Sequence, residues 1–240
     1  MADRYEKQVY LAMLAEQCNR FEDMMQFLEE MVQGKKDDLS SDERNLLSIA
    51  YKNSISLRRQ AIRTLLAYEM KEKKREESLY LNYIIEYKEK VEKELEELCL
   101  RIIKNIDTNL VTRAKDSEAK VFYHKMIADY YRYIAENVSG EVRKSFAELS
   151  RKSYESASQI AKELPISNPI KLGLALNYSV FYYEVLSDQE TACNIAKETL
   201  DQVKSNLSNV DEEDEEYKDA FSIINLLQEN LSMWTTEGDA

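Results

Sequence analysis

The segment EESLYLNYIIEYKEKVEKELEELCLRIIKNIDTNL, residues 76–110, has the pattern of one long amphipathic helix. Its apolar residues recur at steps of three and four, as on the buried face of a helix, and they include Leu81, Ile84, Ile85, Val91, Leu95 and Leu98. Much of the chain repeats this pattern. Only 4 glycines and 2 prolines occur in 240 residues, too few for a fold that depends on many tight turns. The sequence therefore predicts an all-α protein.

About nine helices with short links are expected along the chain. The predicted helical stretches are 9–34, a helix that starts at Ser41 and meets no breaker before Ser78, 76–110, 117–137, 140–164, 169–186, 188–209 and 215–234. Pro169 is expected in a first helical turn, where a missing N–H costs nothing. No linker separates domains, so we expect one domain over residues 1–240. Antiparallel helix pairs are expected to stack into a curved array whose concave, amphipathic groove is the binding surface.

The charge balance limits the partners of the chain. Its 33 Lys and Arg residues face 45 Asp and Glu residues, which gives a formal net charge of −12. Such a chain is repelled by nucleic acid and by anionic lipid, so neither is an expected partner, and an anion site requires a local basic island. No signal peptide or membrane-spanning run is evident. We expect the cytoplasm, with the nucleus as a second compartment.

Signatures of enzymes and metal sites are missing from the sequence. It contains no GxGxxG, GxxxxGK[ST], HExxH or GxSxG motif. The three cysteines, Cys18, Cys99 and Cys193, form no CxxC pair, and His124 is the single histidine. The acidic run 211–216 imitates a carboxylate cluster, but a solvated loop is the better interpretation. We expect no catalysis, no metal and no cofactor.

Two pairs of basic residues share a spacing within helices that are otherwise rich in apolar residues. Lys52 and Arg59 are seven residues apart, which places them on one helix face, and Arg63 continues that stripe. Lys125 and Arg132 repeat the same spacing in another helix.

The spacing leaves two interpretations of these stripes open. Each is a solvated basic face or part of an ion pair, for example between Arg132 and Asp129 or Glu136. Alternatively, the stripes face each other across a groove and bind an oxyanion, with Tyr133 adding a hydroxyl donor.

A second pattern lies in the C-terminal half. Asn177 and Glu184 are seven residues apart and are flanked by Leu176 and Val180. A later helix carries the corresponding set Ile223, Leu226, Asn230, Met233 and Trp234. An amide within an apolar stripe needs a partner, and an extended peptide backbone would supply one. The alternative is that each asparagine caps a neighbouring helix or faces water.

Five blocks of this sequence closely resemble the 14-3-3 proteins, and the resemblance covers nearly the whole chain. They are RNLLSIAYKN (44–53), SEAKVFY (117–123), DYYRYIAE (129–136), PIKLGLALNYSVFYYE (169–184) and DAFSIINLLQENLSMW (219–234). The resemblance implies a nine-helix dimeric adaptor whose groove binds phosphoserine or phosphothreonine segments of client proteins. A helical scaffold that binds unphosphorylated partners is the alternative.

The resemblance also implies roles for individual residues. The phosphate ligands would be Lys52, Arg59, Arg132 and Tyr133, with Arg63 and Lys125 in a wider basic patch. The ligand backbone would be held by Asn177 and Asn230, with Glu184 and Trp234 beside them. The apolar wall would comprise Leu176, Val180, Ile223, Leu226 and Met233.

A dimer edge is implied over residues 1–35 and 80–100. Arg20 and Asp23 match one side of the family's interface, and Tyr87, Lys90 and Glu94 match the other. Apolar contacts from Leu14, Cys18 and Ala61 are expected to dominate because exposed ion pairs are individually weak. A homodimer is expected, with heterodimers as a further assembly.

Three departures from the family pattern stand out. Ala61 replaces a serine whose phosphorylation opens the dimer in many members, so that switch should be absent. Met233 replaces a usual leucine, which a flexible apolar side chain tolerates. The tail 235–240 is short, so we do not expect it to cover the groove.

Overall fold

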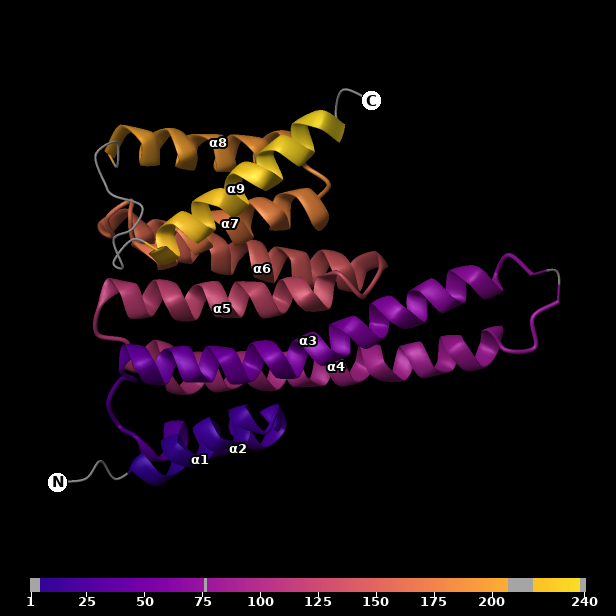
Figure 1. Cartoon of the computed structure of the whole chain (residues 1–240), viewed down its shortest axis with the longest axis horizontal. Coiled ribbons are helices and arrows are strands. Elements are labelled where there is room, and N and C mark those ends of the chain that lie inside the picture. Colours follow the sequence, from indigo (N-terminus) through magenta and orange to yellow (C-terminus); the bar gives the residue numbers. More distant parts are fainter. Residues whose placement is uncertain (1–4, 76, 207–217, 238–240) are drawn as a thin grey trace. The chain divides into compact units, whose positions relative to one another are not determined.

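The computed structural model describes residues 5–75, 77–206 and 218–237, and these residues form helices joined by short links (Figure 1). Within them lie nine α-helices and two short 3₁₀-helices. They are α1 (Glu6–Gln17), α2 (Phe21–Gly34), α3 (Ser41–Glu72), α4 (Leu81–Asn109), η1 (Val111–Arg113), α5 (Ser117–Ala135), α6 (Gly140–Ile160), η2 (Ala161–Glu163), α7 (Pro169–Glu184), α8 (Gln189–Asn206) and α9 (Lys218–Glu237). The all-α prediction is confirmed. The acidic run 211–216 and the start expected for the last helix lie outside the described residues.

The predicted stretch 9–34 is two helices, and residues 18–20 separate them. Asn19 adopts a φ of 55°, a left-handed conformation that asparagine reaches more readily than most residues. The Arg20 amide donates back to the Ala15 carbonyl at 2.8 Å, which closes the end of α1. The apolar spacing continues across this break, which is why the periodicity alone missed it.

The link between α3 and α4 is also longer than expected, because Ser78 organises a turn. Its hydroxyl donates to Glu72 at 2.6 Å and accepts the Leu81 amide at 3.1 Å. α3 therefore ends at Glu72 and α4 starts at Leu81. At the other end of α3, Ser40 and Glu43 form a reciprocal capping box.

The chain divides into two compact units, Met1–Ala114 and Lys115–Ala240. In the first unit, α3 and α4 pack along each other as the two longest helices, and α1 and α2 pack together beside them (Figure 1). Polar contacts tie α2, α3 and α4 together: Asn105 donates to the buried Tyr51 hydroxyl at 2.7 Å, and the exposed Arg101 pairs with the buried Glu29.

The second unit has two buried clusters that share α7. In the first, Val121, Ala128 and Ala135 repeat every seven residues along α5 and pack with Tyr154 of α6 and Phe181 of α7. Small residues at this ridge let α5 and α6 approach closely, and the Ser150 hydroxyl donates to the Ala128 carbonyl at 2.9 Å.

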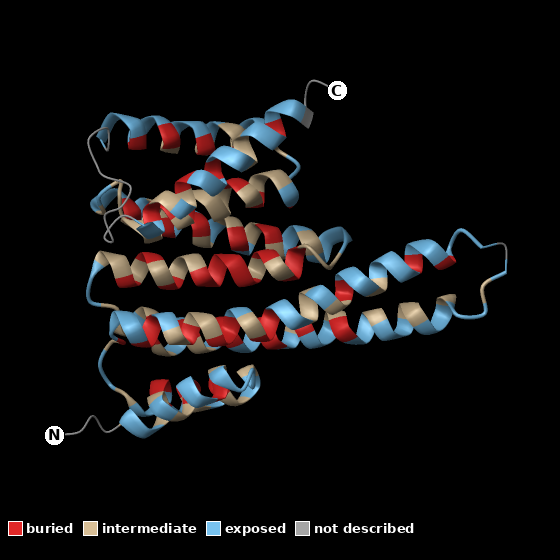
Figure 2. Ribbon diagram, viewed as in Figure 1, coloured by how far each residue is buried: buried red, intermediate tan, exposed pale blue. Residues whose placement is uncertain are grey.

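The second cluster joins α7, α8 and α9. It comprises Leu172, Ala192, Ala196, Leu200, Val203, Ala220, Ile224, Leu227 and Trp234. On helices such as α2, α4 and α8, buried and exposed residues occupy different sides, whereas α5 has no exposed residue (Figure 2). Pro169 occupies the first turn of α7, as predicted, and Asn168 caps that helix with its side-chain oxygen.

Candidate functional site

The basic residues predicted on the first stripe lie along α3 in the first unit. Lys52 and Arg63 are exposed, and Arg59 is half-buried. Among the residues that the structure describes, neither Lys52 nor Arg63 has a carboxylate within ion-pair distance. The positive charges of Lys52 and Arg63 therefore face solvent. Positions 52, 59 and 63 share a face because seven residues make two helical turns and four make one.

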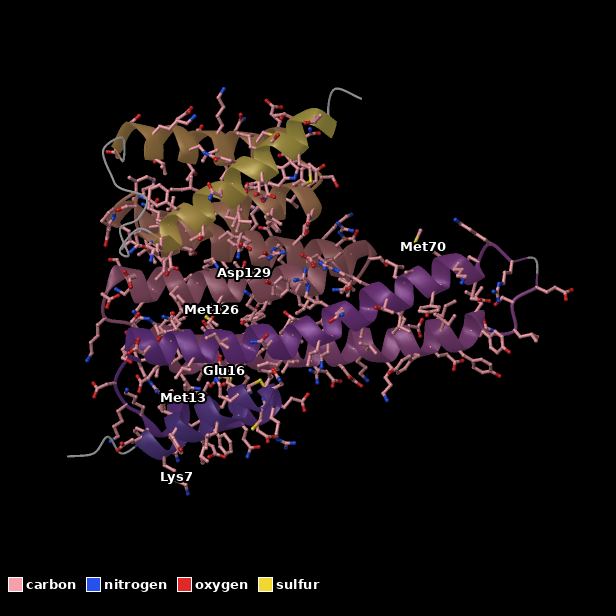
Figure 3. All side chains as sticks on the ribbon, in the orientation of Figure 1. Lys7, Met13, Glu16, Met70, Met126 and Asp129 are labelled. Carbon is pink, nitrogen blue, oxygen red and sulfur yellow. The ribbon has the colours of Figure 1, made fainter. Side chains whose placement is uncertain are left out.

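The second stripe, on α5, has a different environment, since it surrounds a buried carboxylate. Figure 3 labels this residue, Asp129, on α5. Lys125 donates to Asp129 at 3.0 Å from one turn before it, and Arg132 lies 3.7 Å from Asp129 on the turn after it. Glu136 accepts a 2.6 Å hydrogen bond from Arg132. Within α5, Arg132 therefore forms ion pairs with Asp129 and Glu136, the two carboxylates that the ion-pair interpretation named.

Two further helices of the same unit contribute to this network. Tyr154 of α6 donates to Asp129 at 2.5 Å and accepts from Arg132 at 3.3 Å. Asn177 of α7 contacts both carboxylate oxygens of Asp129 at 2.9 Å through its amide nitrogen. The carbonyl oxygen of that amide takes no part in these two bonds, so it is left as an acceptor for another group.

Burial and charge act against each other within the network. Burial raises the pKa of the Asp129 carboxyl, but Lys125 and Arg132 outweigh it and hold this pKa below its ordinary value. Burial lowers the pKa of the Arg132 guanidinium, but the tyrosines and carboxylates around it raise that pKa well above its ordinary value. Burial raises the pKa of the Tyr154 hydroxyl, and the negative charge of Asp129 raises it further. At neutral pH, Asp129 and Arg132 are therefore ionised and Tyr154 is neutral.

The guanidinium of Arg132 is fixed in position by these contacts. Its side chain is 6% exposed. The ring of Tyr133 lies 4.6 Å from its central carbon, which is cation–π distance. A guanidinium held in this way loses little side-chain freedom when it binds an anion.

The predicted apolar residues lie on α7 and α9 of the second unit. Leu176, Val180 and Ile223 are half-buried and pack against the cluster shared by α7, α8 and α9. Leu226 and Met233 are 47% and 49% exposed on α9. These five residues are therefore partly exposed apolar side chains backed by a packed core.

The predicted backbone-binding residues fall into different environments. Asn177 and Asn230 are half-buried, and Glu184 is exposed at the end of α7. Trp234 is 2% exposed and its ring stacks on Tyr183 at a centroid distance of 4.8 Å. The indole is thus a core group, and we do not carry Trp234 into the proposed binding site.

The residues predicted at the dimer edge are mostly exposed in the first unit. Tyr87 is 56% exposed, and Lys90 and Glu94 are exposed beside it on α4. Arg20 and Asp23 pair with each other at the start of α2. That ion pair lies within one chain, so each side chain already has a partner of opposite charge.

The described part of the chain offers neither a cluster of metal ligands nor a helix suited to a membrane. Residues 5–75, 77–206 and 218–237 bring no three His, Cys, Asp or Glu side chains together as a metal site. In the same ranges, no helix has both the length and the apolar content that crossing a bilayer needs.

Sequence reasoning missed the central role of Asp129 and the part played by Tyr154. A signal for Asp129 was present, because an acid four residues after Lys125 and three before Arg132 shares their helix face. Nothing in the sequence connects Tyr154 to them, since it lies on another helix.

Comparison with known proteins gives one consistent family. The family model of the 14-3-3 protein matches residues 11–235. The chain is 45% identical over 240 residues to the checkpoint signal transducer rad25 of Schizosaccharomyces pombe, covering 100% of this chain and 88% of the relative. It is 46% identical over 231 residues to the 14-3-3-like protein GF14 chi of Arabidopsis thaliana, covering 95% and 86%. A 14-3-3 protein homolog of Trichoderma harzianum is 44% identical over 233 residues, covering 97% and 88%.

Proposed function

The chain belongs to the 14-3-3 family, and we propose from this that it binds phosphoserine or phosphothreonine segments of client proteins. The family consists of adaptor proteins that bind clients and form dimers, and the relatives support a client-binding adaptor role for this chain. The finer step, recognition of the phosphate, is our proposal. The cytoplasm, with the nucleus as a second compartment, stays our prediction for where the chain acts.

The observation that carries the proposal is the Asp129 network. One buried carboxylate holds Lys125 and Arg132 of α5 and Asn177 of α7. A guanidinium with a fixed orientation suits a phosphate, because its N–H groups donate in a planar fork. An amide whose nitrogen is already bonded can accept a peptide N–H with its oxygen. We assign phosphate binding to Arg132 and Tyr133, and backbone binding to Asn177.

The charges of this network leave no surplus for a dianion. Lys125 and Arg132 contribute two positive charges, and Asp129 and Glu136 contribute two negative charges. Binding of a phosphate that carries close to two negative charges therefore needs further cations. We propose that Lys52 and Arg59 of α3 supply them as ligands, with Arg63 in the wider basic patch, as the family resemblance implies.

The remaining site residues are proposed on their chemistry. Leu176, Val180, Ile223, Leu226 and Met233 would contact the apolar side chains of the bound segment. Asn230 would hold its backbone together with Asn177, and Glu184 would lie near them. We expect this surface to add affinity without selecting for phosphate, because apolar contacts do not distinguish the two forms of a peptide.

Fluorescence anisotropy with a labelled Arg-Ser-x-pSer-x-Pro peptide and its unphosphorylated twin tests the proposal. We expect the phosphorylated peptide to bind at least about tenfold more tightly, since one hydrogen bond to a charged group is worth roughly 1.5–3 kcal/mol. Lys52→Glu should remove that preference. Lys144→Glu, the same charge change at a side chain that is 74% exposed on α6, should retain it. Equal binding of the two peptides would instead favour a scaffold for unphosphorylated partners.

A double-mutant cycle asks whether α3 and α5 act on the same phosphate. Lys52→Ala and Tyr133→Phe are combined, and the affinity for the phosphopeptide is measured for all four proteins. We expect the two losses to be non-additive by about 0.5 kcal/mol or more, as for residues that share one ligand. Strict additivity would mean that the two residues do not share a phosphate.

The dimer edge is also proposed and has a separate test. Asp23→Lys combined with Glu94→Lys should raise the monomer fraction in sedimentation velocity. Glu141→Lys combined with Glu155→Lys is the matched control on α6, where we propose no interface. If the doubly reversed protein sediments like the control, the assignment of this interface is wrong.

A further inference from the structure

The second unit contains a cavity on the side of α7 that faces away from the proposed peptide contacts. Residues of η2, α6, α7 and α8 line this cavity of about 250 Å³, which is open to solvent, and its apolar residues include Leu174, Ala175 and Ile195. Positions 171, 174, 175 and 178 share one face of α7, whereas 176, 177 and 180 lie on the opposite face, because successive residues turn by about 100°. The cavity is therefore distinct from the surface assigned above to peptide binding.

Lys171 is one of the residues that line this cavity. Lys171 is half-buried, and its Nζ donates to the Leu164 carbonyl at 2.8 Å. Among the described residues, no carboxylate lies within ion-pair distance of it. Burial lowers the pKa of the Lys171 amine, and no charge opposes this change.

The groups around Lys171 come from each neighbouring helix. Three of them line the same cavity: Lys162 of η2, Tyr178 of α7 and Glu198 of α8, of which Lys162 and Glu198 are exposed. From α5, Glu118 accepts from the Asn168 amide at 2.9 Å. None of these groups forms an ion pair with the Lys171 ammonium. A larger fraction of Lys171 is therefore the neutral amine than in an exposed lysine.

We propose that Lys171 is an acylation site that accepts a short, uncharged acyl group from a thioester. The lone pair of Nζ attacks the thioester carbonyl carbon, the C–S bond breaks and an amide N–C bond forms. The departing thiolate takes up the proton that the nitrogen loses, so the products are an amide and a thiol. Lysine amines in apolar surroundings are nucleophilic because burial favours the neutral amine, which carries the lone pair.

The surroundings of the amine also fit the product. The amide nitrogen retains one hydrogen, which can continue to donate to the Leu164 carbonyl. The acyl carbons would lie against Leu174, Ala175 and Ile195, where they gain apolar contact. A negatively charged acyl group, such as succinyl, would face the low polarity of these walls and the carboxylate of Glu198. The site is therefore expected to prefer acetyl or butyryl groups.

Site-resolved peptide mass spectrometry of the full chain tests the proposal. The probes are the N-acetylcysteamine thioesters of acetate, butyrate and succinate, and the measured quantity is the acylation rate of Lys171 relative to that of Lys162. Lys162 is an internal control because it lines the same cavity but is exposed. At pH 7.5 we expect Lys171 to react at least about threefold faster with the acetyl and butyryl probes. The ratio should be lowest for the succinyl probe.

Two variants of α8 separate this mechanism from simple accessibility. Thr199→Glu places a carboxylate in the cavity wall, which should favour the charged amine and bring the rate ratio down to about one. Asn194→Glu adds the same charge on the same helix at an exposed position outside the cavity lining, and it should leave the ratio unchanged. A ratio at or below one in the wild-type chain would overturn the proposal, as would equal ratios in the two variants.

Discussion

The two basic stripes have the same spacing in the sequence but differ in what surrounds them. On α3, Lys52 and Arg63 are exposed and have no ion pair within the described residues. On α5, the Arg132 side chain is 6% exposed and is held by two carboxylates and a tyrosine. Charge on α3 is therefore available to a ligand, whereas charge on α5 is largely neutralised within the protein.

This difference shows that equal spacing does not mean equal contribution. A buried, paired arginine provides fixed geometry, and its removal leaves Glu136 without this cation and Asp129 with Lys125 alone. An exposed lysine provides net charge, and its removal costs little stability. We infer that α5 orients the proposed ligand and that α3 supplies the attraction. Substitutions on the two helices should therefore separate stability from affinity.

The largest expected effect is the loss of stability in Arg132→Ala. Removing this guanidinium leaves Asp129 and Glu136 without their shared cation, which should lower the free energy of unfolding by about 3–5 kcal/mol. Urea denaturation followed by circular dichroism measures the change. Lys52→Ala is the matched substitution on α3 and should change the unfolding free energy by less than about 0.5 kcal/mol. Similar losses in the two variants would contradict the contrast between the stripes.

An intermediate effect is expected for Asp129→Asn. The amide keeps the size of the side chain but not its charge, so Lys125 and Arg132 lose a counter-ion and the protein loses about 1–3 kcal/mol of stability.

This loss should depend on pH in a defined direction. The pKa of Asp129 is lower in the folded chain than in the unfolded chain. Its ionisation therefore stabilises the fold fully above the unfolded value of about 3.9, and this contribution is lost as the pH falls through the lower folded value. Denaturation from pH 7 to pH 3 should show a difference in the free energy of unfolding between wild type and Asp129→Asn that is constant down to about pH 5 and then narrows. The exposed control Asp107→Asn should change the free energy of unfolding at pH 7 by less than about 0.5 kcal/mol.

The smallest expected effect is a change in the salt dependence of binding. An exposed charge is screened over a Debye length of about 10 Å at 0.1 M salt, so Arg63 should contribute at low salt and little at high salt. Anisotropy titrations with the phosphopeptide should show a loss of affinity of a few-fold for Arg63→Ala in dilute buffer, which approaches zero near 1 M salt. Tyr133→Phe should reduce the affinity for the phosphopeptide by a similar factor in dilute buffer and near 1 M salt. A salt-independent loss for Arg63→Ala would mean that its charge acts from a desolvated position.

Much of the fold could be predicted because helical periodicity and helix-capping signals are local. Pro169 and the pattern of Leu81, Val91 and Leu95 each report on a single helix, and the structure confirms the helices that they indicate. The break at Asn19 was missed because the apolar spacing continues through it. The early end of α3 was missed because it depends on a hydrogen bond from Ser78 back to Glu72.

The candidate site was less predictable from its residues alone. The spacing of Lys125 and Arg132 identified a stripe but left open whether those charges were paired. Asp129 joins α5 to Asn177 of α7 and Tyr154 of α6, and contacts between helices leave no periodic trace in the sequence. Trp234 continues the spacing of Leu226 and Asn230, yet its ring lies in the core.

The sequence by itself determined the helical class, the approximate helix positions and the family, because these depend on local periodicity and on long blocks of matching residues. Tertiary structure alone decided which of the described charges are neutralised, which amide nitrogen is already bonded and which cavity-lining lysine has no carboxylate within ion-pair distance among the described residues. Those properties depend on distances between side chains of different helices and on their burial. Both determine the electrostatic free energy of a group, and neither is encoded by its place along the chain.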